Sequence, residues 1–260
     1  MVHFVLELKL ESGQHLGITQ EVGYWLSPDM GSTPTSTTLH PSFLPFLHSK
    51  GVYLDVGCGP GRISRELGKS GIRVIGAEPN MNDLVSAQHF DQIGDNKYTN
   101  EYIQAFGEAL PFRSASFDGA FLLATLGAVD RKTREDILVD TLRCLRPGAP
   151  LYIAEFARIK DAEAYTSDGK RWIEVYQKDS QLVGEYGSVI VHNKNGSTRF
   201  IGHHFTEEEL IGLLVEHGVA VSNVEHVQIN SSVSGQARDS LNIWGRKSEK
   251  ALKARTTELL

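Results

Sequence analysis

From residue 51 to residue 156, apolar and polar positions alternate in blocks that predict strands and helices in turn. Apolar runs of strand length occur at 52–57, 73–78, 101–106, 117–124 and 150–156. Segments with helical spacing lie between them at 61–69, 80–93 and 131–146. Strands that alternate with helices are typical of right-handed βαβ crossovers in a parallel sheet. The pattern therefore predicts an α/β fold with a doubly wound, mostly parallel sheet.

The regular alternation stops after residue 156. The segment 157–205 holds an amphipathic helical stretch around Trp172 and then two apolar runs, 189–192 and 198–205. These runs are separated by Asn195-Gly196, a signal for a type I′ hairpin turn. We therefore expect a helix and a β-hairpin inserted after the fifth strand of the alternating region.

The chain closes with one helix and two strands. Thr206 followed by Glu209 is the signature of a capping box, which predicts a helix over 206–217. Two apolar runs follow at 219–228 and 240–246. They complete a sheet of seven strands.

The N-terminal region also carries a pattern. Residues 2–10 alternate strictly and predict a strand, and residues 23–48 are rich in Pro, Ser and Thr but also hold aromatic side chains. We interpret this stretch as an arm docked on the domain. The N-terminal strand and the hairpin of 189–205 could form a small extra sheet, either within one chain or across a homodimer, and the sequence leaves both open.

Composition and charge narrow the function. The 260 residues are 40% hydrophobic and 22% charged, as in a globular protein, and the net charge of −6 provides no global attraction to nucleic acid or anionic lipid. No apolar run is long enough to span a membrane, and the N-terminus does not resemble a signal peptide. Two cysteines, Cys58 and Cys144, cannot form a structural zinc site alone. We expect a cytoplasmic protein without a metal site.

The stretch "VYLDVGCGPGRIS" at 52–64 holds the strongest chemical signal. Its glycines are Gly57, Gly59 and Gly61, whereas a dinucleotide-binding fingerprint needs the third glycine at position 62, where this chain has Arg62. The spacing therefore argues against a nicotinamide cofactor. Asp55 ends the strand before this turn, and its carboxylate could hold a cationic group at the carboxyl edge of the sheet.

This stretch resembles the first motif of the class I S-adenosylmethionine-dependent methyltransferases, of the small-molecule type that includes ubiquinone and sterol C-methylases. Three further segments fall into register with that family: "AFGEALPFRSASFD" at 105–118, "CLRPGAPLYIAEF" at 144–156 and "HHFTEEELIGLLVEHG" at 203–218. The resemblance implies a Rossmann-like, seven-stranded sheet and S-adenosylmethionine as cofactor. It divides the chain into an N-terminal strand and lid arm at 1–48, a cofactor-binding domain at 49–156 and 206–247, and an acceptor-binding insertion at 157–205.

The resemblance also implies roles for single residues. Glu78, 21 residues after Gly57, stands where the family's acid binds both ribose hydroxyls. The family's usual adenine-binding Asp is replaced by Phe106, so main-chain groups of Phe106 and Gly107 are expected to hold the adenine, with Phe106 or Met81 packed on a ring face. The expected cofactor-binding residues are Asp55, Gly57, Cys58, Gly59, Gly61, Glu78, Pro79, Met81, Phe106, Gly107, Glu108 and Ala124.

Candidates on the acceptor side come from the residue types. His203 or His204 could act as general base, because the ordinary pKa of histidine lies near the working pH. Adjacent strand residues point to opposite faces, so at most one of them reaches the site. Glu155, at a strand end, could orient the acceptor.

Aromatic residues are the other acceptor-side candidates. Tyr24 and Trp25 could cover the sulfonium, whose positive charge is attracted to a π face, or could simply anchor the arm. Tyr165, Trp172 and Tyr176 could line the acceptor pocket, although Trp172 and Tyr176 have the spacing of a core-facing helix side.

These observations predict a methyltransferase that acts on an O, N or C atom of a small, partly hydrophobic molecule. A tRNA-modifying methyltransferase is one alternative, and the acidic composition argues against it. A non-catalytic binding or partner subunit with the same fold is another, and the presence of Asp55, Glu78 and the glycines argues against that. Neither a membrane nor a nucleic acid is expected as a partner.

Overall fold

The computed structural model describes residues 5–9, 15–19, 39–93, 100–161, 163–166, 168–192, 198–230 and 237–248. Its strands are β1 (Val5–Lys9), β2 (His15–Thr19), β3 (Val52–Val56), β4 (Arg73–Glu78), β5 (Glu101–Gln104), β6 (Gly119–Leu123), β7 (Pro150–Phe156), β8 (Ser188–His192), β9 (Thr198–His203), β10 (Val219–Asn230) and β11 (Ala237–Lys247). Its α-helices are α1 (Arg62–Lys69), α2 (Met81–Ile93), α3 (Arg131–Cys144), α4 (Trp172–Val183) and α5 (Glu207–Glu216), with short 3-10 turns η2 (Pro41–Phe46) and η3 (Leu126–Ala128).

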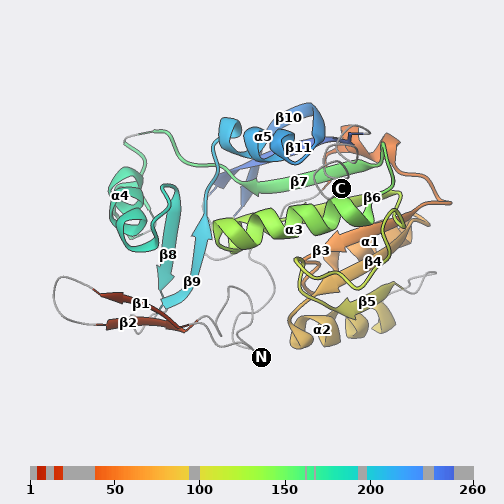
Figure 1. Cartoon of the computed structure of the whole chain (residues 1–260), viewed down its shortest axis with the longest axis horizontal. Coiled ribbons are helices and arrows are strands. Elements are labelled where there is room, and N and C mark those ends of the chain that lie inside the picture. Colours follow the sequence, from red (N-terminus) through yellow and green to blue (C-terminus); the bar gives the residue numbers. More distant parts are fainter. Residues whose placement is uncertain are drawn as a thin grey trace, which may run out of the picture.

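A seven-stranded sheet forms the centre of the molecule, in the order β10-β11-β7-β6-β3-β4-β5 (Figure 1). β3 runs parallel to β4 and β6, and β5 and β7 extend the parallel part on either side. β11 pairs antiparallel with β7, and β10 antiparallel with β11. This confirms the predicted fold, an α/β protein with a mostly parallel, seven-stranded sheet.

The sheet is buried on both faces, as its nearly continuous apolar strands predict. In β7, Leu151 and Ile153 belong to the core that contains α3 and α5. Tyr152 and Ala154 alternate with them and belong to the opposite core, which contains α1 and η2. We call the side of the sheet covered by α3 and α5 the α3 face, and the side covered by α1 and η2 the α1 face.

The insertion between β7 and α5 contains α4, β8 and β9, and lies at the end of the molecule away from β5 (Figure 1). β8 and β9 form an antiparallel hairpin. Trp172 and Tyr176 of α4 pack with Val189 of β8 in a small core of their own. The insertion is thus a helix packed on a hairpin, as the sequence predicts, and its turn at Asn195-Gly196 lies outside the described residues.

The structure corrects one expectation for the N-terminal strand. β1 pairs antiparallel with β2, and β8 pairs with β9, so the two pairs form separate two-stranded sheets within this chain. β2 escaped prediction because it is short and contains Gly17, which is unfavourable in strands. Among the residues described, no helix has the length and apolar character needed to cross a membrane.

Candidate active site

The turn between β3 and α1 has the backbone conformation that its glycines allow. Gly57, Gly59 and Gly61 adopt positive φ angles of 70°, 50° and 71°, a region that other residues rarely enter. A Cβ on Gly57 would also lie 2.7 Å from Oγ1 of Thr125. The turn therefore brings bare main chain to the carboxyl edge of the sheet, where ligands bind in doubly wound folds.

Two buried carboxylates flank this turn. Asp55 of β3 accepts a hydrogen bond from Oγ of Ser64 at 2.9 Å, and burial raises its pKa to about 6. Glu78, the last residue of β4, accepts from the N–H of Gly59 at 3.1 Å and from the N–H of Asn80 at 2.9 Å. Burial raises the pKa of Glu78 to about 7, although these two hydrogen bonds act in the opposite direction and lower it. Both acids lie where a hydrogen-bond donor or cation from a ligand would favour their ionised form.

The expected adenine side has the character of a nucleoside site. Met81 opens α2 just after Glu78, and its side chain is 51% exposed. Phe106, after β5, is 53% exposed. Two large apolar side chains that stay in solvent beside a buried acid can cover the flat faces of a base. The residues present therefore fit the ribose and adenine of S-adenosylmethionine.

The remaining expected cofactor residues lie around the same edge. Cys58 is buried, and burial raises the pKa of its thiol, so it packs as a neutral group. The carbonyl of Pro79 accepts from Nε2 of Gln104 at 3.0 Å. Glu108 is exposed on the loop after β5, close to Gly107. Ala124 follows β6 with a φ of 56°, a strained conformation for alanine that is typical of functional sites.

Glu155 faces a short turn of backbone. Its Oε1 accepts from the N–H groups of Thr125 at 2.9 Å and Leu126 at 2.7 Å, and its Oε2 accepts from that of Gly127 at 3.1 Å. Burial raises its pKa to about 7. Both carboxylate oxygens are thus engaged with the turn after β6, and this geometry makes Glu155 a positioning residue for the turn instead of a group that faces the acceptor.

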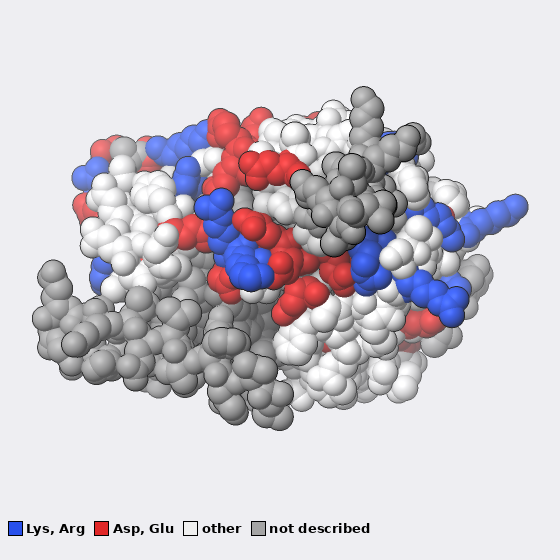
Figure 2. Space-filling view, viewed as in Figure 1, with Lys and Arg blue, Asp and Glu red and all other residues white. Residues whose placement is uncertain are grey.

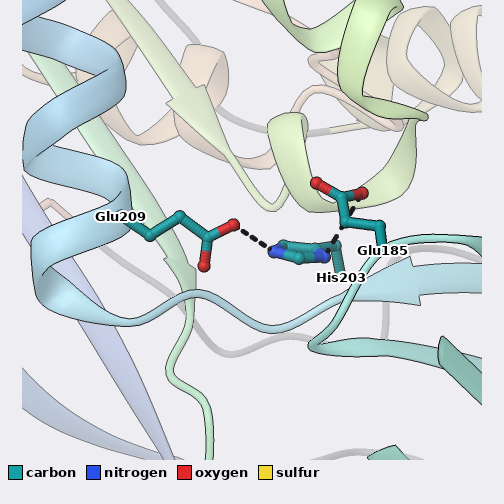
Figure 3. Close-up of side chains that lie close together, drawn as sticks. All are labelled: Glu185, His203 and Glu209. Carbon is teal, nitrogen blue, oxygen red and sulfur yellow. Dashed lines mark hydrogen bonds and ion pairs between the residues drawn. The ribbon is translucent and has the colours of Figure 1, made fainter.

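His203 lies on the α3 face between two carboxylates (Figure 3). Its Nε2 is 2.8 Å from Oε1 of Glu209, and its Nδ1 is 3.5 Å from Oε2 of Glu185. Glu185 is bound in turn by the buried guanidinium of Arg134 at 2.8 Å. The two carboxylates face opposite ring nitrogens, whereas a histidine binds a metal through one of them. We therefore interpret these four residues as a hydrogen-bonded chain that joins α3, the insertion and α5.

His204 lies in an aromatic environment. Its Nδ1 is 2.8 Å from the hydroxyl of Tyr176, and its ring centroid lies 5.4 Å from that of Trp172 and 5.7 Å from that of Phe156. Burial lowers its pKa to about 3, so the imidazole is neutral near neutral pH. The adjacent histidines do take opposite directions. Both ring nitrogens of His203 face carboxylates, whereas His204 faces the hydroxyl of Tyr176, and the role of general base stays a prediction for either residue.

The structure brings only part of the predicted acceptor set together. Trp172, Tyr176 and His204 contact one another through their rings. Tyr165 is 52% exposed and makes no ring contact with them within the described residues. Tyr24 and Trp25 lie outside the described residues.

A cavity of about 260 Å³ opens beside His203. It lies where the start of α3, with Asp130 and Lys132, meets the insertion, with Gly184 and Ser188. This position is on the α3 face, whereas the glycine turn leads into α1 on the other face. The cavity therefore belongs to the junction between the insertion and the core.

Several residues of the site had no distinct signal in the sequence. Ser64 lies in the first turn of α1, Thr125 follows a strand end, and Arg134 has the spacing of an ordinary helix residue. Thr125 donates through Oγ1 to the carbonyl of Val56 at 2.9 Å and so fixes the turn after β6 against β3. Contacts of this kind depend on which strands become neighbours, and a single sequence does not state that.

Comparisons with known proteins agree with this geometry. A family model described as "Methyltransferase domain" matches residues 54–153. A solved S-adenosylmethionine-dependent methyltransferase from Methanosarcina mazei is 30% identical, with a TM-score of 0.73, over 82% of this chain and 99% of that one. An O-methyltransferase of Aspergillus sclerotiorum is 30% identical over 174 residues, 63% of each chain. A malonyl-[acyl-carrier protein] O-methyltransferase of Enterobacter lignolyticus is 33% identical over 104 residues, 40% of this chain and 38% of the relative.

The matches thus span less than two thirds of the length of these two curated relatives. The solved relative, in contrast, is covered almost completely at the same level of identity. The predicted family is confirmed: the chain belongs to the class I S-adenosylmethionine-dependent methyltransferases.

Proposed function

We propose that this protein transfers the methyl group of S-adenosylmethionine to an oxygen atom of a small, partly hydrophobic acceptor. The observation that carries the proposal is the pair of buried acids, Asp55 and Glu78, on either side of a glycine turn at the carboxyl edge of the sheet. Oxygen is preferred over nitrogen and carbon because both curated relatives described above are named as O-methyltransferases.

Each group of the site has a task in this proposal. Asp55 binds the amino group of the methionyl part, Glu78 accepts the ribose hydroxyls, and Phe106 and Met81 cover the adenine. Bound S-adenosylmethionine would supply an activated methyl group: the deprotonated acceptor oxygen would attack the methyl carbon in line while the carbon–sulfur bond breaks and S-adenosylhomocysteine leaves. The protein contributes mainly position and exclusion of water. Ala124 and Thr125 would form the wall next to the reacting centre, and Glu155 holds the N–H of Thr125 in place.

The acceptor side consists of the insertion and the N-terminal arm. We assign residues 49–156 and 206–247 to cofactor binding, 157–205 to acceptor binding and 1–48 to a lid that includes Tyr24 and Trp25. Trp172, Tyr176 and His204 offer an aromatic wall that suits an apolar acceptor. Tyr165 would contact the acceptor from the edge of this segment.

A small-molecule acceptor is favoured over a nucleic acid by charge. The net charge is −6, and acidic side chains gather over the middle of the α3 face, with lysine and arginine side chains to either side of them (Figure 2). Such a surface repels a phosphate backbone. We also propose a cytoplasmic location, which suits two free, buried cysteines, and leave a homodimer as a further proposal.

Calorimetric titration with S-adenosylhomocysteine tests the cofactor half. We expect the wild type to bind and Gly59→Val to fail, because a β-branched residue does not tolerate the φ of 50° at this position. Gly148→Val is the matched control, since Gly148 has a φ of 73° far from the turn and open space around it. A wild type that does not bind would disprove the proposal. Methyl incorporation from labelled cofactor into a metabolite extract then separates an enzyme from a non-catalytic subunit.

A further inference from the structure

Three polar groups converge beside the aromatic wall of the insertion. The guanidinium of Arg238 lies over the ring of Trp172, with its carbon 4.6 Å from the ring centroid. The ring centroid of His204 lies 5.4 Å from that of Trp172. Arg238 comes from β11, Trp172 from the start of α4, and His204 directly follows β9. Three elements distant in sequence therefore bring these groups to one place.

Each of the three groups has an unused hydrogen-bond donor. The indole N–H of Trp172 is buried and has no acceptor in the described parts of the chain, and the side chain is only 8% exposed. The half-buried guanidinium of Arg238 takes part in none of the hydrogen bonds or ion pairs found there. A buried donor left unpaired costs about 1–3 kcal/mol, and proteins keep few of them.

His204 supplies the third donor. The oxygen of Tyr176 accepts from the N–H of Ile159 at 3.3 Å, and among the described residues its own proton has only Nδ1 of His204, at 2.8 Å, as acceptor. A neutral imidazole that accepts at Nδ1 carries its proton on Nε2. Burial and the nearby charge of Arg238 lower the pKa of His204 and keep the ring in this neutral form. Within the described ranges Nε2–H has no acceptor, so it can donate to a ligand.

The cluster formed by Arg238, Trp172 and His204 lies on the same side of the sheet as the glycine turn of the cofactor site. Phe156 is the last residue of β7 and pairs with Ser240 of β11, so Arg238, two residues before Ser240, is on the same face. Tyr152 and Ala154, which alternate toward that face, pack in the core that contains α1. α1 starts from the glycine turn after β3. The cluster and the turn thus share the α1 face and the carboxyl edge. Phe156 of β7 is two strand spacings from β3, roughly 10 Å, and Arg238 of β11 is three, roughly 14 Å.

We propose that Arg238, Trp172 and His204 form a subsite that binds an anionic oxygen group, such as a carboxylate, on the methyl acceptor. Among the described residues, the subsite offers donors and a positive charge and pairs with no carboxylate, which suits an anion. The aromatic rings around it would contact an apolar or aromatic body of the same molecule. The inference rests on the proposed function, because it assigns the acceptor of that reaction to a chemical class.

The test compares acids with their neutral amides. The wild type is titrated in a calorimeter with three acids: 4-hydroxybenzoate, octanoate and 6-hydroxy-2-naphthoate. Each acid is compared with its primary amide, in the presence and in the absence of saturating S-adenosylhomocysteine. We expect at least one acid to bind about tenfold or more tightly than its amide, as for a charged hydrogen-bonded pair. Arg238→Met should abolish this preference, Arg238→Lys should keep part of it, and Trp172→Phe should weaken it through loss of the N–H.

Arg246→Met is the matched control. Arg246 is also on β11 and stacks on an aromatic ring, that of Phe46, with its carbon 5.0 Å from the centroid. Its removal should leave the acid preference unchanged. The proposal is overturned if no acid is preferred over its amide by the wild type, or if Arg238→Met retains the preference. Arg238→Met should bind S-adenosylhomocysteine as tightly as the wild type does. If instead the wild type itself fails to bind S-adenosylhomocysteine, the proposed function fails, and that outcome is distinct from the failure of the subsite.

Discussion

The backbone N–H of Gly59 donates to Oε2 of Glu78 across 3.1 Å and joins the turn after β3 to the end of β4. The other oxygen of the same carboxylate accepts from Asn80. A carboxylate has about four lone-pair sites, so two acceptor positions remain for the hydroxyls of a ribose. Glu78 thus shapes the glycine turn before a ligand arrives and can still bind one.

Glu78→Gln should weaken S-adenosylhomocysteine binding by about 10- to 100-fold, the value of a charged hydrogen bond. Because burial raises the pKa of Glu78 to about 7, the ionised acceptor becomes available only as pH rises. Wild-type affinity should therefore increase from about pH 6 to about pH 8, whereas the variant should show no such increase. Calorimetry at several pH values measures both. Glu101→Gln, at an exposed ion pair with Arg73, should behave as wild type.

Gly57→Ala should both destabilise the fold and impair cofactor binding. The added Cβ would lie 2.7 Å from Oγ1 of Thr125, in a backbone conformation with φ of 70°. Gly148→Ala has nearly the same φ, 73°, but nothing within 4 Å of its Cβ. The control should lose about 1–2 kcal/mol of unfolding free energy from backbone strain and bind normally. Equal losses in urea denaturation for both variants would show that the contact with Thr125 is unimportant.

Glu155 should give the protein a pH-dependent stability. Its folded pKa of about 7 lies above the ordinary value of 4.5, so the folded state holds the proton more tightly. This contribution is complete below about pH 4.5 and is lost as pH rises through about 7. The unfolding free energy of Glu155→Gln should therefore decline less steeply with pH than that of the wild type.

At about pH 5 the same variant should be less stable by about 1–3 kcal/mol, because its amide cannot accept the N–H of Gly127. Glu66→Gln is the control, since Glu66 is an exposed residue of α1. Parallel pH profiles for wild type and Glu155→Gln would contradict this assignment.

The buried pair of Arg134 and Glu185 should couple the insertion to the core. Arg134 is 2% exposed and also donates to the carbonyls of Leu126 and Val129. Arg134→Met should cost about 3–5 kcal/mol because it leaves buried acceptors and a carboxylate unpaired. Lys132, two residues earlier, forms an exposed pair with Asp136, and Lys132→Met should leave the unfolding free energy almost unchanged, because solvent screens the pair.

A double-mutant cycle with Glu185→Gln separates the ion pair from the carbonyl contacts of Arg134. Thermal unfolding followed by circular dichroism provides the readings. A coupling energy no larger than that of the Lys132–Asp136 pair would mean that the insertion is held by its apolar contacts alone.

The sequence predicts the order of strands and helices well because the central strands are rich in apolar residues and most of the turns between elements hold glycine or proline. β7 has the predicted bounds, and α1, α2 and α5 begin within one residue of their predicted starts. The acids of the cofactor edge could also be predicted, since Asp55 and Glu78 end strands that become neighbours. Contacts between side chains on different strands could not be predicted from the sequence. Nothing in the pattern around Glu155 indicates that its carboxylate binds the turn at Thr125, because both are distant in sequence.

The same reason explains what the sequence misses on the acceptor side. His203 and His204 are adjacent, and their opposite directions follow from strand geometry. The path of the insertion decides which side chains surround each histidine. It places Glu185 beside the ring of His203 and Tyr176 beside the ring of His204. Arg238 has no local signal at all, because only the assembled strands show that no described carboxylate pairs with it.

The insertion leaves and rejoins the core at one point. The N–H of Phe205 donates to the carbonyl of Phe156 at 2.9 Å, and the N–H of Arg158 donates to the carbonyl of Phe205 at 2.7 Å. Two chain ends that are already held together can carry inserts of very different length at little entropic cost, since closing a loop depends only weakly on its length. The segment is therefore an exchangeable cassette. Through this single junction, evolution or design can replace the chemistry that selects the acceptor while the sheet that holds the methyl donor stays unchanged.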